Sequence, residues 1–420
     1  MIETMVEPAK NTSGTKTVQP AFSRLTLLYS SDPEKKKMGG AVGYMQFLFR
    51  QALKHDIPLR FIGVNLTGQH VREGYEFIPV QNGNDSWQQF LLRLFFKAPF
   101  LKFKQNEIVH VFRIAYCFPL LLFHPRIRVV CVSAEPLAAA AHRYPVWLYK
   151  IVEKLFTLVE RFVLSRIRVL CTSDEVLGKY FQPKYRRHLT RLPVFLSTAS
   201  GIDTELFQLL DRATLRQQNR IQPSEKILLF VGRLAPVKRV NFLLEIFKKF
   251  HETCSFSRFL IVGNGESLPE LQRTVENLPV TGVEFRGERS QTELVQIYNI
   301  ADVLLLASET EGNPTVVREA LACGLPVIST PVGDVPRLLS APEMGKIVSP
   351  NSRDEYLAAV KEILEYDRAQ IRRVCRQAAE NFSEEKIFHE ILQMYQNIVD
   401  RTPNSERAEK KSIHGKVNRE

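Results

Sequence analysis

The chain has 420 residues, of which 45% are hydrophobic and 24% are charged, with 20 glycines and 23 prolines. This composition indicates a globular protein of two to three domains and excludes a collagen-like chain, a largely disordered chain and a small disulfide scaffold. The first 200 residues carry 28 Lys and Arg against 14 Asp and Glu, whereas the remainder carries 29 against 31. The whole positive excess therefore lies in the N-terminal half, which favours an anionic partner there.

The ends of the chain, residues 1–20 and 401–420, are polar and are predicted to be disordered. Between them, short apolar runs alternate with segments of helical period. The runs predicted as strands are 25–29, 59–64, 76–80, 108–112, 128–133, 168–172, 226–231, 258–262, 283–286, 303–307, 326–329 and 346–348. The segments predicted as helices include 44–54, 241–251, 291–300 and 315–322.

Near-continuously apolar strands alternating with helices predict parallel sheets covered on both faces. Because the pattern occurs twice, we expect an α/β protein of two doubly wound Rossmann-like domains, joined near residues 199–207. The predicted domains are 21–205 and 206–383. Ligands of such folds bind beyond the carboxyl ends of the strands, so the expected site is a cleft between the domains.

The remaining composition predicts a cytoplasmic protein. The longest charge-free apolar stretch, residues 114–125, is too short to span a bilayer, and the first residues have no signal-peptide core. The six cysteines are scattered without paired spacings, which predicts buried reduced thiols rather than a zinc site or disulfides.

The first motif with chemistry is an apolar strand that ends at Val231-Gly232 and is followed by Arg233 and Lys238 before a helix. Glycine permits close backbone approach, and two cations beside a helix N-terminus suit a diphosphate. The alternative is that both cations are ordinary exposed residues of a strand–turn–helix unit.

The second motif contains two carboxylates eight residues apart, Glu311 and Glu319. Pro314 suits the first helical turn and Asn313 its cap, which places Glu311 on the loop and Glu319 inside the helix. The first backbone N–H groups, at Thr315 and Val316, are expected to bind anionic oxygens, and a carboxylate suits vicinal sugar hydroxyls. The alternative is that Glu319 is a solvated residue paired with a cation.

Four motifs occur in order: V-G-R-L-x5-K, IVGNGESLPELQ, VEFRGE, and an E-x7-E stretch with EALACGLPVIST. Together they resemble the nucleotide-sugar half of retaining GT-B glycosyltransferases, more narrowly glycosyltransferase family four, over residues 226–400. Residues 38–53, 159–181 and 200–207 are similar more loosely. Residues 384–400 resemble the closing helix that crosses back to the N-terminal domain, which in this fold lies on the acceptor side.

The resemblance implies a catalytic set of Glu311, Lys238 and Arg233. The two cations would hold the donor diphosphate and stabilise the leaving group, and Glu311 would contact the donor sugar near the reacting carbon. Glu319 would bind the ribose hydroxyls. The other residues implied in donor binding are Gly39, Gly40, Gly232, Gly263, Arg286, Asn313, Pro314, Thr315 and Val316.

No D-x-D sequence occurs, so no metal and no other cofactor is expected, and cations and helix N-termini would stabilise the diphosphate instead. Two positions depart from the family pattern. Phe112 stands where relatives often carry a second His after His110, and Ser133-Ala134-Glu135 stands where many carry His or Asp. His110 is expected to be packed and to point away from residue 112.

Residues 87–104, WQQFLLRLFFKAPFLKFK, combine aromatic and aliphatic residues with four cations and no acid. Such a stretch suits the headgroup region of an anionic membrane, so peripheral contact with the inner face of a membrane is expected, without nucleic acid as a partner. The alternative is a core helix followed by an exposed loop.

The leading hypothesis is transfer of a hexosyl group, with retention and without metal, from a nucleotide diphosphate sugar to a hydroxyl of a lipid-linked, polysaccharide or other acceptor. Two alternatives stay open. One is a nucleotide-sugar epimerase or hydrolase on the same fold, and the other is a non-catalytic partner subunit that binds nucleotide sugar.

Overall fold

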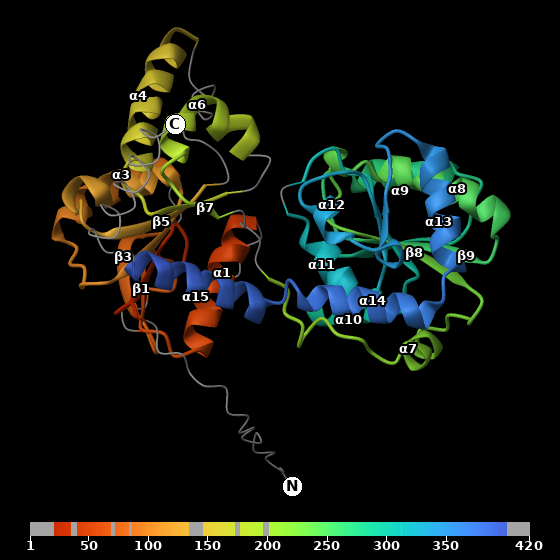
Figure 1. Cartoon of the computed structure of the whole chain (residues 1–420). Helices are drawn as coiled ribbons and strands as arrows, with labels where there is room; N and C mark the ends of the chain where they lie inside the picture. The colour runs from red at the N-terminus through yellow and green to blue at the C-terminus, as the bar shows by residue number, and fades with distance from the viewer. Residues whose placement is uncertain are drawn as a thin grey trace, which may run out of the picture.

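The computed structural model describes residues 21–34, 40–68, 72–83, 86–133, 146–172, 177–195, 201–311 and 313–400. The segments predicted to be disordered, 1–20 and 401–420, and the predicted donor-binding residue Gly39 lie outside the described residues. Figure 1 shows two α/β units joined by the chain between them and by the C-terminal helix.

The N-terminal unit contains a seven-stranded sheet in the order β3-β2-β1-β4-β5-β6-β7, and every pair in it is parallel. The strands are β1 (Leu25–Leu28), β2 (Leu59–Asn65), β3 (Glu76–Asn82), β4 (Ile108–Phe112), β5 (Arg128–Val132), β6 (Val169–Cys171) and β7 (Val194–Phe195). The six strands predicted for this half are confirmed. The short β7 was not predicted, because two residues form no apolar run.

The helices of this unit connect successive strands. They are α1 (Gly40–Lys54), α2 (Trp87–Lys97), the 3-10 turn η1 (Ala98–Phe100), α3 (Ile114–Phe123), α4 (Val146–Leu164), the π-turn η3 (Leu177–Phe181) and α6 (Gln182–Leu189). The strand order reverses between β1 and β4. Because crossovers are right-handed, α1 covers one face of the sheet, whereas α2, α3, α4 and α6 cover the other.

The C-terminal unit contains a six-stranded parallel sheet in the order β10-β9-β8-β11-β12-β13. The strands are β8 (Lys226–Val231), β9 (Ser257–Val262), β10 (Val283–Gly287), β11 (Val303–Leu306), β12 (Val327–Ser329) and β13 (Gly345–Ile347). The helices and short turns are α7 (Arg212–Gln218), η4 (Pro236–Lys238), α8 (Val240–Thr253), α9 (Leu268–Asn277), α10 (Gln291–Ile300), α11 (Thr315–Ala322), α12 (Val335–Leu338), η5 (Pro342–Met344), α13 (Arg353–Glu365) and α14 (Arg368–Glu380). The predicted fold class, two doubly wound parallel sheets, is confirmed.

Each sheet has its own hydrophobic core. The first core draws on residues between 22 and 192 and also on residues 388–399, and the second on residues between 202 and 379. All six cysteines are free thiols, and five of them are buried as predicted, whereas Cys254 is half-buried. No helix in the described part of the chain is long and apolar enough to cross a membrane.

The C-terminal helix α15 (Glu384–Asp400) follows the second unit in sequence but packs on the first (Figure 1). Its ring of Phe388 contacts Phe47 of α1 edge to face, with centroids 6.4 Å apart. Deeper along the helix, the Tyr395 hydroxyl and His110 Nδ1 share a buried hydrogen bond of 2.6 Å. Burial lowers the pKa of His110 to about 3, so its imidazole is neutral inside the core.

Where α15 begins, the two segments that connect the units, residues 201–203 and 382–384, lie against each other. Ile202 and Ser383 form a parallel bridge, and the Glu384 N–H donates to the Ile202 carbonyl at 2.9 Å. A Cβ on Gly201 would lie only 2.5 Å from the Glu384 Cα, so this crossing requires glycine. The Glu384 carboxylate then accepts from Arg50 at 2.6 Å and from Gln51 at 2.8 Å, which fixes the start of α15 on α1.

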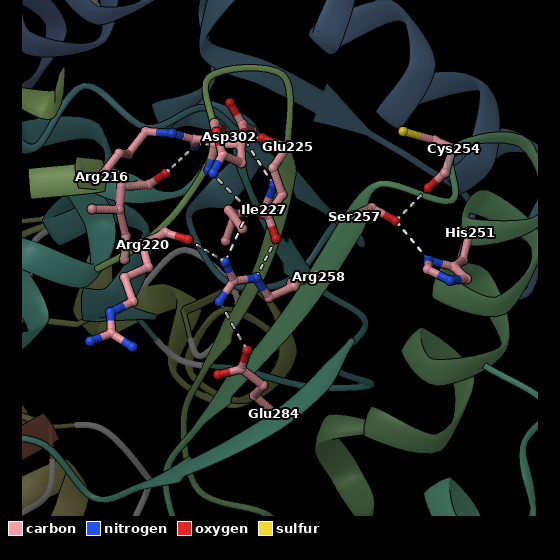
Figure 2. A network of polar contacts seen from close by, with 12 residues as sticks. Arg216, Arg220, Glu225, Ile227, His251, Cys254, Ser257, Arg258, Glu284 and Asp302 are labelled. Atoms are coloured by element: carbon pink, nitrogen blue, oxygen red, sulfur yellow. Dashed lines mark hydrogen bonds and ion pairs between the residues drawn. The ribbon is translucent and has the colours of Figure 1, made fainter. Parts of the chain in front are cut away.

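A buried polar network holds the amino ends of the C-terminal strands (Figure 2). Asp302, directly before β11, accepts from the Ile227 N–H at 2.8 Å, from Arg212 at 2.6 Å and from Arg216 at 3.4 Å. Arg258 of β9 donates to Glu225 at 2.9 Å and lies 3.2 Å from Glu284 of β10. These contacts bind β8, β9, β10 and β11 to one another at the edge opposite their carboxyl ends.

We predict that Asp302→Ala destabilises the C-terminal unit by about 3–5 kcal/mol, because it leaves two largely buried guanidinium groups without their carboxylate. Thermal unfolding measured by circular dichroism checks the loss. Asp354→Ala is the matched control, because its side chain is 92% exposed and 3.6 Å from Lys249, and it is expected to cost at most about 1 kcal/mol. Equal melting temperatures for the two variants would contradict the assigned role of Asp302.

Candidate functional site

The reversal of strand order in the C-terminal sheet lies between β8 and β11. The chain leaves these adjacent strands in opposite directions, so the loops at their carboxyl ends diverge and leave room for a ligand. The loop after β8 carries Gly232, Arg233 and Lys238, and the loop after β11 carries Glu311. Residues predicted from motifs more than 70 positions apart therefore meet at the point where a doubly wound sheet binds ligands.

Lys238 and Glu311 form a direct ion pair across this point. The Ser308 hydroxyl, which is buried, donates to the same Glu311 oxygen at 2.7 Å. The Glu309 N–H donates to the Val237 carbonyl at 3.0 Å, so the two loops are also joined through backbone. The result is a partly exposed ammonium–carboxylate pair in which both groups are oriented. Ser308 was not predicted, because no motif distinguishes it from other loop serines.

Arg233, the second predicted cation, is held by a carboxylate that the sequence did not single out. Its guanidinium lies 3.0 Å from both carboxylate oxygens of Glu266, which belongs to the loop after β9. The side chain of Arg233 is 71% exposed and that of Glu266 is 50% exposed. Binding of a diphosphate by Arg233 would therefore exchange a weak surface pair for a phosphate contact.

Gly263 lies where the loops after β8 and β9 touch. Its φ is 132°, and a Cβ at this position would lie 1.9 Å from the Gly232 carbonyl oxygen. The Gly232 N–H donates to the Val262 carbonyl at 3.0 Å. The structure therefore explains Gly263 by the close approach of two loops, and its predicted contact with the donor stays a prediction.

Glu319 lies within α11 with only 9% of its surface exposed. Its Oε2 accepts a hydrogen bond from the buried Tyr298 hydroxyl of α10 at 2.7 Å. Burial raises the pKa of Glu319, although the Tyr298 and Thr315 side chains oppose the shift. The alternative of a solvated helix residue paired with a cation is therefore wrong. Tyr298 was not predicted, because a helix-to-helix contact leaves no local pattern.

The start of α11 differs by one residue from the prediction. The helix begins at Thr315 with Pro314 as its N-cap, at φ −70° and ψ 102°, whereas we expected Asn313 as the cap and Pro314 in the first turn. Pro314 accepts an intrahelical bond through its carbonyl, from the Val317 N–H at 3.2 Å. The first-turn amides of Thr315 and Val316 remain at the positive end of the helix dipole, on the loop that carries Glu311.

Arg286, expected near the base, lies on the edge strand β10 and is ion-paired with Glu284 of the same strand. The structure does not bring Arg286 into contact with Lys238, Glu311 or Glu319 through any described interaction. Among the residues that the structure describes, no group of three or more His, Cys, Asp or Glu lies together as metal ligands would.

The N-terminal sheet presents its own reversal point between β1 and β4, where Gly40 begins α1. The segment after β1 is anchored by Asp32, whose carboxylate receives a two-fold contact from buried Arg72 at 2.8 and 2.9 Å. The same carboxylate accepts from the Leu66 and Glu34 amides at 2.9 and 3.1 Å. Burial acts to raise the pKa of Asp32, but Arg72 and the two amides outweigh it and hold the pKa below its usual value.

Arg113, directly after β4, has the most strained backbone at this edge. Its φ of 121° and ψ of 131° are unfavourable for any residue with a Cβ, and it caps the start of α3. Its guanidinium carbon lies 5.5 Å from the Trp87 ring centroid. Burial raises the pKa of Tyr116 to about 12, while Ser30 and Arg113 act in the opposite direction. A strained, exposed cation thus stands at the switch point, which the sequence could not reveal.

The two departures from the family pattern lie beside Arg113. Phe112 is buried, and its ring centroid lies 5.1 Å from that of His110. His110 is packed as predicted, but the expectation that it points away from residue 112 is wrong, because side chains two positions apart in a strand share a face. Ser133 is also buried, whereas Ala134 and Glu135 lie outside the described residues.

Comparison of the fold with solved structures defines its class. Sucrose-phosphate synthase from Thermosynechococcus elongatus superposes with a TM-score of 0.69 over 90% of this chain and 100% of that one, at 18% identity. HepE of Anabaena, in complex with UDP, superposes with a TM-score of 0.66 over 89% and 100%, at 16% identity. At such identities the likeness establishes the fold, which is that of the two-domain GT-B glycosyltransferases.

Sequence comparison gives a family match for the C-terminal unit. Residues 211–382, less than half of the chain, match the family model described as glycosyl transferases group 1. D-inositol 3-phosphate glycosyltransferase of Mycobacterium marinum is 29% identical over 209 residues. That alignment covers 47% of this chain and 44% of the relative, so the chain matches less than half the length of this curated protein.

We predict that Glu319→Gln stabilises the free protein, because glutamine keeps an acceptor for Tyr298 but carries no buried charge. With a raised pKa in the fold, Glu319 costs stability increasingly as pH rises from the unfolded value of about 4.3 through the folded value. The stability of the Glu319→Gln variant should not show this decrease as pH rises. Melting temperatures of both proteins between pH 4 and pH 8 check the prediction, and a wild-type advantage at pH 8 would contradict it.

We also predict that Arg113→Gly raises stability. The strain at φ 121° is worth about 1–3 kcal/mol, more than the roughly 0.5–1 kcal/mol that glycine loses in chain entropy. Arg191→Gly is the control, because Arg191 is exposed and has no positive φ, and it should lower stability slightly. Urea unfolding gives the free energy of unfolding of wild type and of both variants. A lower value for Arg113→Gly than for wild type would show that the backbone is not strained.

Proposed function

We propose that this protein is a retaining glycosyltransferase that moves a hexosyl group from a nucleotide diphosphate sugar to a hydroxyl acceptor without a metal ion. The observation that carries the proposal is the Lys238–Glu311 pair at the reversal of strand order, on loops that also present Arg233 and the start of α11. The match of residues 211–382 to the model of glycosyl transferases group 1 and the GT-B fold support it.

The donor would lie against the carboxyl edge of the C-terminal sheet. Arg233, Lys238 and the first amides of α11 would bind its diphosphate, and Glu319 its ribose hydroxyls. The structural neighbour HepE has been crystallised with UDP and with UDP-glucose, which supports a nucleotide sugar as the ligand class. Buried Glu319 suits this role because its carboxylate, already oriented by the Tyr298 hydroxyl, can accept hydrogen bonds from a diol.

In the proposed reaction, an acceptor hydroxyl approaches the anomeric carbon on the face from which the diphosphate departs. The bond between that carbon and the phosphate oxygen breaks as the new carbon–oxygen bond forms, and the hydroxyl proton passes to the departing phosphate. Lys238 and Arg233 would stabilise the negative charge that grows on the leaving group. Glu311, oriented by Lys238 and Ser308, would hold the donor sugar by its hydroxyls.

The acceptor would meet the carboxyl edge of the N-terminal sheet, where Arg113 and the segment after β1 lie. We propose a lipid-linked or polysaccharide acceptor at the inner face of a membrane, because the first 200 residues carry 28 Lys and Arg against 14 Asp and Glu. Arg113 adds a cation at the edge itself and so favours an acceptor that carries negative charge.

We predict that Lys238→Ala lowers the transfer rate by about 100- to 1000-fold, the usual cost of removing one donor to a developing anion. The measurement is transfer of radiolabelled sugar from UDP-, GDP- or ADP-sugars into a membrane extract, with EDTA present. Lys249→Ala is the matched control, because Lys249 lies on α8 of the same unit and is half-exposed beside Asp354. Wild-type turnover in Lys238→Ala would contradict the residue assignment.

The same assay tests the alternatives. Product formed without any acceptor would indicate an epimerase or hydrolase instead. A thermal shift with one nucleotide family, which reaches about 2.7 kcal/mol at 100 times the dissociation constant, combined with no turnover would indicate a binding subunit. Loss of transfer in EDTA, restored by a divalent cation, would overturn the metal-independent mechanism.

A further inference from the structure

One face of the N-terminal sheet is covered by the four helices α2, α3, α4 and α6. We call the described segments that carry these helices the α2–α6 layer: residues 86–133, 146–172 and 177–191, which also include strands β4, β5 and β6. Within it α2 packs on α3, α3 on α4, and α4 on α6. Figure 1 shows α4 and α6 projecting from the N-terminal unit on the side away from α1 and α15. The layer is thus separate from the surface that α15 occupies.

Exposed apolar side chains gather on this layer. Of the twelve large hydrophobic residues that are exposed in the described chain, nine belong to it: Leu92, Phe96, Phe100, Leu122, Phe123, Ile151, Leu155, Leu158 and Tyr180. On α4, Ile151, Leu155 and Leu158 are 63%, 56% and 61% exposed. Their spacing of four and three residues places them in one stripe along the helix. Such a concentration on one face of a water-soluble fold marks an interaction surface.

The charges of the layer are almost all of one sign. The segments that form it carry 17 Lys and Arg against only three carboxylates, Glu107, Glu153 and Glu160. Glu107 and Glu160 are buried, at 3% and 0% exposure, and Glu153 is ion-paired with Lys184 at 3.4 Å. A second copy of this surface would be repelled, because like charges face each other across a self-complementary interface. The charge therefore points to an anionic partner.

On α4, a row of cations lies beside the apolar stripe. Lys150, Lys154 and Arg161 are exposed, and at 100° per residue they form a row next to the stripe of Ile151, Leu155 and Leu158. The opposite side of α4 faces α6, where Glu160 accepts from the Tyr185 hydroxyl. An apolar stripe bordered by cations is the pattern of a helix that lies in the interface of a membrane. A nucleic acid would use the cations but leave the stripe unpartnered.

We propose that the α2–α6 layer docks on an anionic lipid bilayer, with α4 lying in the interfacial plane. Ile151, Leu155 and Leu158 enter the region below the headgroups, and Lys150, Lys154 and Arg161 contact lipid phosphates. The exposed Leu92, Phe96 and Phe100, of the segment predicted to contact membranes, add a second apolar edge on the same layer. This inference concerns a surface that the donor site does not use, and it holds whichever reaction the protein catalyses.

The test is sedimentation with phosphatidylcholine vesicles, with and without 30 mol% phosphatidylglycerol, at increasing salt. We expect binding to the anionic vesicles only, weakening as salt rises. The triple variant Ile151→Gln, Leu155→Gln, Leu158→Gln should bind at least tenfold more weakly, and Lys150→Gln, Lys154→Gln, Arg161→Gln likewise. Glutamine preserves helix propensity. The matched control changes three exposed residues of the C-terminal unit, Leu209→Gln, Phe256→Gln and Ile347→Gln, and should bind as wild type.

Unchanged circular dichroism and an unchanged thermal shift with nucleotide would show that the variants fold, and they also separate this test from that of the proposed function. Equal binding of wild type to both kinds of vesicle, or wild-type binding by the α4 stripe variant, would overturn the proposal. So would a dimer in solution that the stripe variant converts to a monomer while vesicle binding stays the same.

Discussion

Parallel strand pairing is the constraint on which the rest of this structure depends. In a parallel sheet every strand delivers its carboxyl end to the same edge, so loops from distant parts of the chain meet there. The reversal of strand order at β8 and β11 then decides which two loops diverge around a ligand. Lys238 and Glu311 are partners because of this order, and not because of their separation of 73 residues in sequence.

The candidate site keeps its cations neutralised in the free protein. Lys238 is paired with Glu311 and Arg233 with Glu266, so each cation is already held by a carboxylate. Glu319 is oriented in advance by Tyr298 at the expense of a raised pKa. Charged groups held in this way bind a charged ligand with little rearrangement, because their orientation is set before the ligand arrives. The α2–α6 layer differs in composition, because its segments carry 17 Lys and Arg against three Asp and Glu.

Helix α15 ties the two units together with contacts from several kinds of chemistry. Glu384 binds α1 through charge, Phe388 through ring packing, and Tyr395 through a hydrogen bond to a neutral histidine of β4. The chain therefore crosses between units at 201–203 and again at 382–384, and a parallel bridge joins the two crossings. Gly201 is required at the first crossing because the backbone of Glu384 lies too close for a side chain.

The local pattern of the sequence determined the elements and their type. All twelve predicted strands and the four named helices are present, because apolar runs and helical periods report burial over a few residues. The order of its motifs also indicated the family. Tertiary structure alone decided that Ser308 orients Glu311, that Glu319 is buried and bonded to Tyr298, that Arg113 is strained, and that the α4 stripe remains exposed. The reason is that these properties depend on which distant elements become neighbours, and periodicity within one segment carries no information about the segment packed against it.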